Sequence, residues 1–472
     1  MPDSVPDNMP DNMADNMKVG IIGCGYVFDH YMATWRRHPG LQIAGVADLD
    51  AARLAQATDF YRLKAYATPA ALLADPEITI VANFTSIEAH YAVTKAALEA
   101  GKHVYSEKPL VTQMDQARAL FALAAARGLR LSCAPSNALG PTSQTMWKVV
   151  ADGAVGDVRM VYAEFDDNPI YLMSPEGWQS RSGAPWPYLH EYEMGCTWEH
   201  VGYHLTWMCA MFGPVRAVTA FSKHTLPDKT GKSDKTGKSD KTGKSDKIGQ
   251  PLSPADTPDF SVACLDFVSG VVGRVTCSIA APYDHRMRII GNQGMVHADT
   301  YRHYECPVYL EPFTKLTMNA RKSRSVRTRT WLQALLGVGG RRVPLVRVPP
   351  PGADRIIDTG GPWWNPKAAL QRLKRAELGQ QDKCIGIAEL AAAVAAGRAQ
   401  FPAPDFTLHL TELTLAIQAA GPDGSCHRMQ TGFIPVALPQ ATRTLGRNYR
   451  SYLRPGLLDR LSSKLLDRMH RH

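Results

Sequence analysis

Residues 18–28 read KVGIIGCGYVF, a short apolar run followed by a glycine-rich turn and the start of a helical stretch. Gly23 permits a tight turn there, and Gly25 lets the backbone approach a pyrophosphate group. Phe28 stands where a third glycine is usual, so the turn alone is a weak signal. Asp48 ends the next apolar run, where a carboxylate can accept hydrogen bonds from an adenosine ribose. Strand, turn, helix and acid together predict a dinucleotide site.

The predicted site favours NAD over NADP. A carboxylate at the end of the second run repels the 2′-phosphate that distinguishes NADP. The residues expected to contact the cofactor in this part of the chain are Gly23, Gly25, Tyr26, Val27 and Asp48. The alternative is a glycine turn that binds no ligand, with a solvated aspartate beside it.

Short apolar runs alternate with helical stretches through the first part of the chain. The runs lie at 18–23, 41–47, 78–84, 103–106 and 129–133. Apolar strands that alternate with helices are typical of a parallel sheet covered on both faces. Beyond residue 157 the expected strands lengthen and alternate polar with apolar residues. We therefore predict an α/β fold, with an N-terminal Rossmann dinucleotide-binding domain followed by an α+β domain with an open, mostly antiparallel sheet.

The length of 472 residues is enough for two or three domains of ~100–200 residues. We expect a disordered tail at 1–16, a Rossmann domain at 17–135, a substrate and oligomerisation domain at 136–440, and a basic tail at 441–472. Two insertions interrupt the second domain. They are residues 223–257, expected to be flexible because they contain three copies of KTGKSD, and the basic residues 321–360.

The composition argues against several classes of protein. No run of ~18 apolar residues exists that could span a membrane, and the N-terminus lacks the basic-then-apolar pattern of a secretory signal. The nine cysteines are odd in number and never spaced as CxxC, which argues against a disulfide framework and a structural zinc site. We therefore expect a cytoplasmic location and no metal.

The positive charge is uneven along the chain. The 53 Lys and Arg exceed the 44 Asp and Glu, giving a formal net charge of +9, and basic residues cluster at 321–347 and 443–472. Such clusters can bind phosphate backbones or anionic lipid headgroups. Apolar residues beside the first cluster would suit a membrane surface: Trp331, Leu332, Leu335 and Leu336. No nucleic-acid-binding signature is present, so we do not expect nucleic acid as a partner, and membrane contact stays a minor alternative to a solvated loop or an acidic partner.

The segment Ala97–Leu110, ALEAGKHVYSEKPL, resembles the AleaGkHVxxEKPl signature of the Gfo/Idh/MocA oxidoreductases, the family of glucose–fructose oxidoreductase and inositol dehydrogenase. Weaker resemblances lie at 83–86 with His90, at 152–158 and at 405–418. The resemblance implies a Rossmann domain and a second domain whose open sheet often mediates oligomerisation, so we expect a homo-oligomer. It also implies cofactor contacts at Thr85, His90, Glu107 and Lys108.

The same resemblance implies catalytic residues. Lys108 would stabilise a developing alkoxide and reach the nicotinamide ribose. His204 falls on the catalytic histidine of the family's D-x-G-x-H motif, and an imidazole can take and return a hydroxyl proton. His200, a third catalytic candidate, stands where the family has aspartate, so Glu199 or Tyr203 could substitute for that carboxylate. The i, i+4 spacing of the two histidines also permits metal ligation, but no third ligand is evident.

Residues 166–198 are rich in aromatic and polar side chains. Aromatic faces can stack on sugar rings, and a guanidinium can hold a carboxylate or phosphate. The expected substrate-binding residues are Lys108, Trp178, Arg181, Tyr203 and His204.

We therefore predict an NAD(P)-dependent oxidoreductase of carbohydrate metabolism that acts on CH–OH groups. A hydride would pass between nicotinamide and a secondary hydroxyl or ketone of a sugar, nucleotide sugar or cyclitol. Two alternatives stay open. One is an NAD-dependent glycosidase that uses transient oxidation, and the other is a non-catalytic dinucleotide-binding protein.

Overall fold

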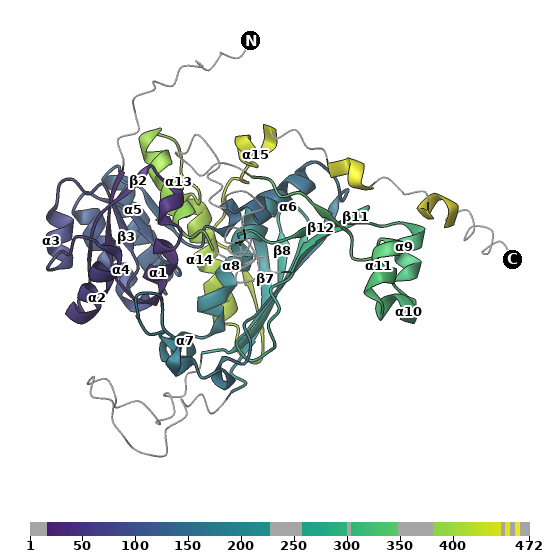
Figure 1. Cartoon of the computed structure of the whole chain (residues 1–472), viewed down its shortest axis with the longest axis horizontal. Coiled ribbons are helices and arrows are strands. Elements are labelled where there is room, and N and C mark those ends of the chain that lie inside the picture. Colours follow the sequence, from purple (N-terminus) through teal and green to yellow (C-terminus); the bar gives the residue numbers. More distant parts are fainter. Residues whose placement is uncertain are drawn as a thin grey trace, which may run out of the picture.

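The computed structural model describes residues 17–226, 257–299, 304–347, 366, 381–444, 449–453 and 458–462, which form an N-terminal domain and a larger sheet domain (Figure 1). Several expectations lie outside the described residues. They concern the tail at 1–16, nearly all of the 223–257 insertion, residues 348–360 of the basic insertion, and residues 463–472.

The N-terminal domain is built on a five-stranded parallel sheet of order β2-β1-β3-β4-β5. Its strands are β1 (Met17–Ile22), β2 (Leu41–Ala47), β3 (Ile80–Asn83), β4 (His103–Ser106) and β5 (Leu131–Cys133). Its helices are α1 (Tyr26–Met32), α2 (Ala51–Tyr61), α3 (Pro69–Ala74), α4 (Ile87–Glu99) and α5 (Met114–Ala126). Buried apolar clusters lie on both faces of the sheet, so its strands are mainly apolar. The predicted Rossmann domain is confirmed.

The second domain contains a nine-stranded sheet of order β13-β12-β11-β10-β6-β9-β8-β7-β14. The strands are β6 (Val158–Asp166), β7 (Val215–Lys223), β8 (Phe260–Phe267), β9 (Val272–Ser278), β10 (Met287–Gly291), β11 (Gly294–Ala298), β12 (Val308–Pro312), β13 (Arg341–Val343) and β14 (Ser425–Arg428). Every pairing is antiparallel except the parallel contact of β6 with β9. The prediction of a mostly antiparallel second sheet is confirmed.

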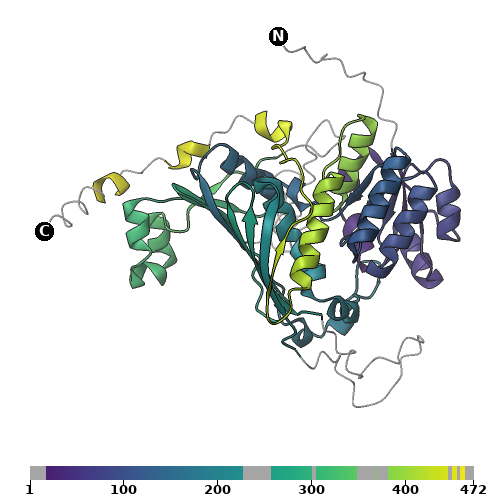
Figure 2. The same cartoon turned by 180° about the vertical axis from the view of Figure 1, so that it is seen from behind.

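Helices cover one face of this second sheet (Figure 2). They are α6 (Pro141–Ala151), α8 (Cys196–Phe212) and α14 (Pro404–Gln418), which pack on the inward side chains of the strands. The remaining helices are α7 (Tyr188–Met194), α9 (Lys315–Ala320), α10 (Arg324–Arg327), α11 (Thr330–Leu336), α13 (Cys384–Ala395) and α15 (Gln440–Thr444). Among the described residues, no helix is long and apolar enough to cross a membrane.

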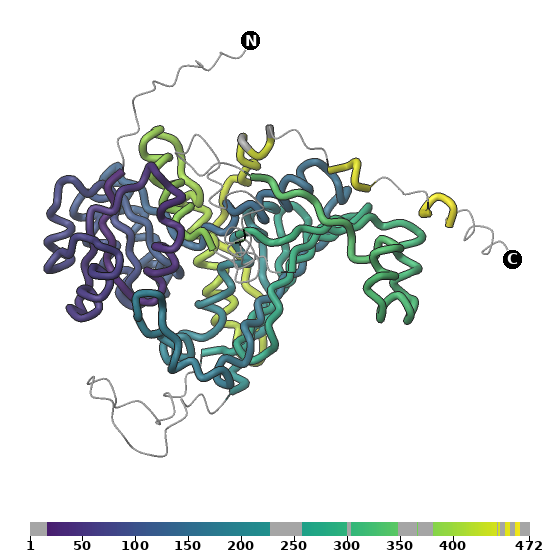
Figure 3. Tube along the Cα trace, viewed as in Figure 1, coloured from purple at the N-terminus to yellow at the C-terminus, as the bar shows by residue number. Residues whose placement is uncertain are grey.

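The C-terminal part of the chain returns to the N-terminal domain, and the trace shows it running between the two domains (Figure 3). Helix α13 adds its apolar residues to a core cluster of the Rossmann sheet. Gly386 is needed there, because a Cβ at this position would lie 2.4 Å from the hydroxyl of Tyr105. His38 Nε2 lies 2.9 Å from Asp382 Oδ1 just before the helix. These contacts fix the position of one domain against the other.

Candidate active site

The glycine turn between β1 and α1 has the shape that a dinucleotide needs. Gly23 has a φ of +101°, and a Cβ there would lie 2.6 Å from the backbone of Phe84, so only glycine fits. The space beside Gly25 is open, with its nearest neighbouring atom 3.7 Å from an added Cβ. Tyr26 and Val27 begin α1, and no side chain caps that helix. The turn therefore leaves a cradle that fits a pyrophosphate group.

Asp48 lies at the end of β2 and holds the turn in place. Its carboxylate accepts hydrogen bonds from the backbone N–H of Cys24 at 2.7 Å and of Asp50 at 2.8 Å. The guanidinium of Arg53 lies near the same turn, 3.7 Å from the position of a Cβ on Gly25. The structure thus brings the carboxylate of Asp48 and the glycine turn together.

Glu107 is a buried anchor behind the EKP motif. Its carboxylate accepts from the hydroxyl of Tyr31 at 2.9 Å, from Lys383 Nζ at 3.0 Å and from the backbone N–H of Lys108 at 2.9 Å. Burial alone would raise its pKa, but the charges of Lys383 and Lys108 bring the pKa of Glu107 down to about 2. Glu107 is 4% exposed, and its hydrogen bond to the backbone N–H of Lys108 helps to fix the backbone that carries the Lys108 side chain. Sequence reasoning missed Lys383, which is far away in the chain and carries no motif.

Lys108 points at helix α8. Its Nζ donates to the backbone carbonyl of Glu199 at 2.7 Å and to Glu199 Oε2 at 2.6 Å, and it lies 6.0 Å from the centre of the Tyr203 ring. Burial lowers the pKa of Lys108, but the charge of Glu199 and the nearby Tyr203 and Glu107 raise that pKa above its ordinary value. The ammonium is therefore positive at neutral pH.

Helix α8 presents different residues on different sides. Glu199 and Tyr203, one helical turn apart, face Lys108. The rings of three residues of this helix lie near Phe165 of β6, with ring centres at 4.7 Å for His200, 5.5 Å for Tyr203 and 5.3 Å for His204. His204 is 0% exposed, and burial lowers its pKa to about 3, so the imidazole is neutral at physiological pH.

His200 belongs to a cluster of histidines and carboxylates below this helix. Its Nε2 lies 3.7 Å from Asp167 Oδ2 and 3.7 Å from Glu191 Oε2. His285 Nε2 lies 3.6 Å from the other oxygen of Asp167. In the part of the chain that the structure describes, no group of three or more His, Cys, Asp or Glu is arranged to hold a metal ion.

His90 braces the loop that carries Lys108. Its Nδ1 lies 2.7 Å from the carbonyl oxygen of Pro109, and its Nε2 lies 3.1 Å from that of Thr85. Burial lowers the pKa of His90, and the side chain is 1% exposed. The hydroxyl of Thr85 donates to Asn83 Oδ1 at 2.7 Å at the end of β3. His90 therefore positions the loop that carries Lys108. Thr85 is half-buried just beyond the end of β3.

Residues 178–186 form a short strap that reaches the N-terminal domain. The rings of Trp178 and Trp186 lie 4.9 Å apart at its base, where the N–H of Trp186 donates to the carbonyl of Trp178 at 2.9 Å. Gln179 and Pro185 form an isolated bridge between its two sides. The expected substrate residue Trp178 thus packs within the strap.

The tip of the strap is fixed on Asp29 of α1. The hydroxyls of Ser180 and Ser182 both donate to Asp29 Oδ2, the latter at 2.6 Å, and the hydroxyl of Tyr61 donates to Oδ1. Burial and the neighbouring Asp29 raise the pKa of Tyr61. The charge of Arg181 is near enough to lower that pKa in part. The structure therefore places Arg181 beside α1 and α2, and Asp29 is a contact that the sequence did not indicate.

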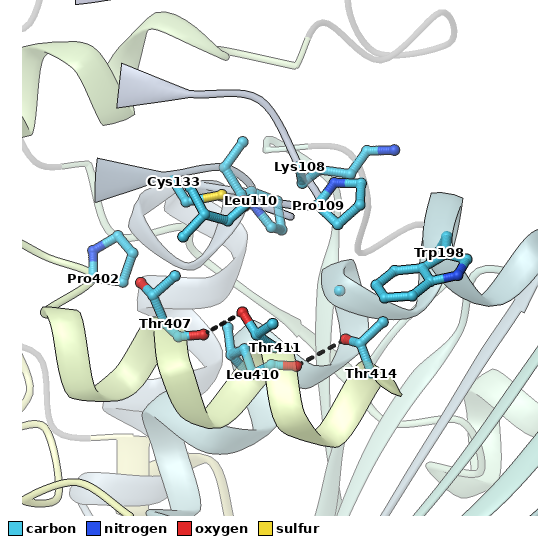
Figure 4. Close-up of a pocket in the computed structure, with 13 residues that line it drawn as sticks. Lys108, Pro109, Leu110, Cys133, Trp198, Pro402, Thr407, Leu410, Thr411 and Thr414 are labelled. Carbon is cyan, nitrogen blue, oxygen red and sulfur yellow. Dashed lines mark hydrogen bonds between the residues drawn. The ribbon is translucent and has the colours of Figure 1, made fainter. Parts of the chain in front are cut away.

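A largely apolar pocket lies on the other side of the EKP loop (Figure 4). It is lined by Lys108, Pro109, Leu110, Cys133, Ala134, Pro135, Trp198, Gly202, Pro402, Thr407, Leu410, Thr411 and Thr414. The amino group of Lys108 points away from the threonines. Thr411 and Thr414 donate to carbonyls of their own helix, each at 2.8 Å. The polar groups of Glu199 and Tyr203 do not line this pocket.

Fold and site geometry together define a two-domain protein of the Rossmann class, with a parallel N-terminal sheet and a second, mostly antiparallel sheet. Residues 17–134 match the family model described as "Oxidoreductase family, NAD-binding Rossmann fold", and residues 143–297 match the model of the GFO/IDH/MocA C-terminal domain. The chain belongs to the Gfo/Idh/MocA family, as the EKP segment indicates.

Similar proteins include trans-1,2-dihydrobenzene-1,2-diol dehydrogenase of Bos taurus, 25% identical over 58% of this chain and 72% of that protein. D-apiose dehydrogenase of Paraburkholderia graminis is 27% identical over 29% of this chain and 37% of that protein. The chain spans 43% to 50% of the length of the first curated relatives it matches. The solved UDP-N-acetylglucosamine 3-dehydrogenase GnnA from Acidithiobacillus ferrooxidans has the same fold, with a TM-score of 0.57, 18% identity, and coverage of 86% of this chain and 98% of that one.

Proposed function

We propose that the protein is an NAD-dependent oxidoreductase that acts on a secondary hydroxyl or ketone of a sugar, nucleotide sugar or cyclitol. The observation that carries the proposal is the buried group of Lys108, Glu199 and Tyr203 beside the EKP loop. Two relatives are, by name, dehydrogenases of a cyclic diol and of a sugar. Nicotinamide, when bound, supplies the position that accepts or returns the hydride.

Gly23, Gly25, Tyr26, Val27 and Asp48 would hold the dinucleotide, with Thr85 near the strand end that leads to Lys108. The carboxylate of Asp48 suits the two hydroxyls of an NAD ribose and repels the phosphate of NADP. The guanidinium of Arg53 also lies near the glycine turn, and its positive charge works against this preference. We therefore propose that NAD is preferred and that NADP binds more weakly.

Lys108 and Tyr203 would handle the substrate oxygen. In the reduction direction, the hydroxyl of Tyr203 donates its proton to that oxygen, and the ammonium of Lys108 stabilises the phenolate that remains. Oxidation runs the same transfer in reverse. Glu199 holds Lys108 in position through two hydrogen bonds. Tyr203 also lies near a second ammonium, that of Lys383, and its phenol is one of the groups that raise the pKa of Lys383 against the effect of burial.

His204 stays a prediction from the family motif. We favour Tyr203 over it because the Tyr203 ring lies 6.0 Å from Lys108 Nζ, although both rings lie near Phe165. His200 lies among the carboxylates below the helix. We propose a structural role for both histidines. Homo-oligomer formation through the uncovered face of the second sheet is proposed from the family resemblance.

The strap supports a second candidate function. A loop fixed to α1 by Asp29 would slow the release of a bound dinucleotide. Retained NAD is what a glycosidase that works by transient oxidation requires, since its cofactor is restored in every cycle. The non-catalytic alternative has no specific observation in its favour.

The test is turnover of a panel of sugars, nucleotide sugars and cyclitols with NAD⁺, followed by the absorbance of NADH. We expect steady NADH formation with at least one substrate, and its loss in Lys108→Met. Glycosidic cleavage without net NADH would instead support the second candidate. If Lys108→Met turned over as fast as wild type, the assignment of the site would be wrong.

A further inference from the structure

Helices α9, α10 and α11 form an arm (residues 315–340) inserted between β12 and β13, at the edge of the second sheet. The arm stands out at the end of the molecule opposite the N-terminal domain (Figure 1). Val326 and Ala320 are buried within it, and Thr314 caps α9 with a capping box. The arm is therefore an ordered part of the fold, and the EKP loop belongs to the opposite domain.

The arm is strongly basic. No acidic residue occurs between residues 313 and 347. Its exposed cations include Lys322, Arg324, Arg327 and Arg329, and the exposed Arg341 and Arg342 follow directly in β13. Within the described ranges, no carboxylate lies within ion-pair distance of these six, whereas Arg321 is paired with the buried Glu311. The arm thus carries a concentrated positive charge that its own fold does not neutralise.

The arm also exposes large apolar side chains. Trp331 is 63% exposed and Leu335 is 57% exposed, one turn apart on α11. Met318 on α9 is 44% exposed. Helices that lie in a membrane interface combine exposed tryptophan and aliphatic side chains with surrounding basic residues, as this arm does.

A second apolar and basic segment lies beside the arm. The hydroxyl of Thr314, at the start of α9, donates to Asp459 Oδ1 at 2.5 Å, which brings residues 458–462 next to it. Leu458 is 54% exposed and Leu461 is 57% exposed, and Arg460 is exposed between them. Two segments that are distant in sequence thus bring the same combination of side chains to one end of the molecule.

We propose that the arm and residues 458–462 form a docking surface for a membrane rich in anionic lipids. The cations would neutralise lipid headgroups, and Trp331, Leu335, Leu458 and Leu461 would enter the headgroup layer. Nucleic acid accounts for the charge but not for the leucines, which gain nothing on a phosphate backbone. The active site would then face away from the membrane, open to soluble substrates.

The test is cosedimentation of the full chain with vesicles of phosphatidylcholine, with and without phosphatidylglycerol. We expect binding to the anionic vesicles alone, weakened by added salt because screening shortens the reach of the charges. The double variant Trp331→Ser/Leu335→Ser and the triple variant Arg324→Gln/Arg327→Gln/Arg329→Gln should each bind at least tenfold more weakly. The matched controls are Ile434→Ser and Arg216→Gln, an exposed apolar side chain and an exposed cation outside the arm.

NADH binding and thermal unfolding show whether each variant is folded. A second readout is the tryptophan emission, which should shift to the blue on vesicles in wild type and shift less in Trp331→Phe. The proposal is overturned if wild type does not bind anionic vesicles, or if folded arm variants bind as wild type does. Binding of duplex DNA that is lost in the same variants, without vesicle binding, would also overturn it.

Discussion

At the scale of single residues, the proposed proton transfer depends on which residues of α8 lie near Lys108. A shift of one position on a helix turns a side chain by about 100°, which separates neighbouring residues onto different faces. Glu199 accepts a hydrogen bond from Lys108, and the Tyr203 ring lies 6.0 Å from Lys108 Nζ. The rings of Tyr203 and His204 both lie near Phe165. The motif in the sequence indicates His204 for proton transfer, and the distance to Lys108 is the ground on which we propose Tyr203.

Tyr203→Phe removes the proposed proton donor and keeps the ring. We expect kcat to fall by about 10²- to 10⁴-fold while KM changes little. His204→Gln should lower the melting temperature and reduce kcat far less than Tyr203→Phe does. Steady-state kinetics on the two purified variants checks both statements. A reversed order of the two effects would return the acid/base role to His204.

Glu107 should make stability depend on acid pH. Its pKa of about 2 lies below the ordinary value of 4.5 because two ammonium groups favour its ionised form over the opposing cost of burial. The ionised group therefore stabilises the fold above pH 4.5, by about 3 kcal/mol, and this is lost as the pH falls toward 2. Glu107→Gln should be less stable than wild type at pH 7. Between pH 4.5 and pH 2 its free energy of unfolding should fall by less than that of wild type.

Urea unfolding at a series of pH values measures that difference. Glu77→Gln is the matched control, because Glu77 pairs with Lys18 on the surface, with 67% of its side chain exposed. Surface pairs of this kind contribute little. Parallel stability curves for wild type and Glu107→Gln across the acid range would contradict the role given to Glu107.

At the scale of elements, the strap joins the second domain to α1. Asp29→Ala removes the acceptor of Ser180, Ser182 and Tyr61 and should release the tip. We expect NADH to dissociate on the order of tenfold faster, since several hydrogen bonds to a charged group are lost. Stopped-flow displacement of NADH measures the rate. Asp59→Ala, an exposed carboxylate on α2, is the control and should leave the rate unchanged.

The elements also show how far the sequence determines the fold. The five mainly apolar runs of the Rossmann sheet could be predicted, because strands buried on both faces are rich in apolar residues. The five strands β10 to β14 are short, and the three residues of β13 are too few for a period to show. The pairing of Glu107 with Lys383 depends on where α13 packs, which no local pattern reveals.

The candidate site divides in the same way. Gly23, Gly25, Asp48, Glu107 and Lys108 could be placed because a turn and a family motif mark them. Trp178 and Arg181 were expected at the substrate because they are aromatic and cationic, yet they build a strap whose tip lies against α1 and α2. Composition indicates what a loop can bind, but its anchoring on Asp29 decides where it lies.

At the scale of the whole molecule, the two domains are held together by buried contacts. Lys383 and Asp382 of the second domain meet Glu107 and His38 of the first. A dinucleotide that binds the folded chain and not the unfolded chain should raise the free energy of unfolding by about 2.7 kcal/mol when its concentration is a hundred times Kd. Thermal unfolding should therefore move to higher temperature with NADH, and by less with NADPH. No shift with either nucleotide would mean that the cradle at Gly25 is not a binding site.

The most direct test of the account is a titration of the purified chain with NADH and NADPH, followed by energy transfer from tryptophan. We predict tight binding of NADH, weaker binding of NADPH, and a smaller difference between the two in Asp48→Ala. Equal or tighter binding of NADPH by wild type would contradict the role of Asp48. Binding of neither nucleotide would contradict the assignment of an oxidoreductase activity to this chain.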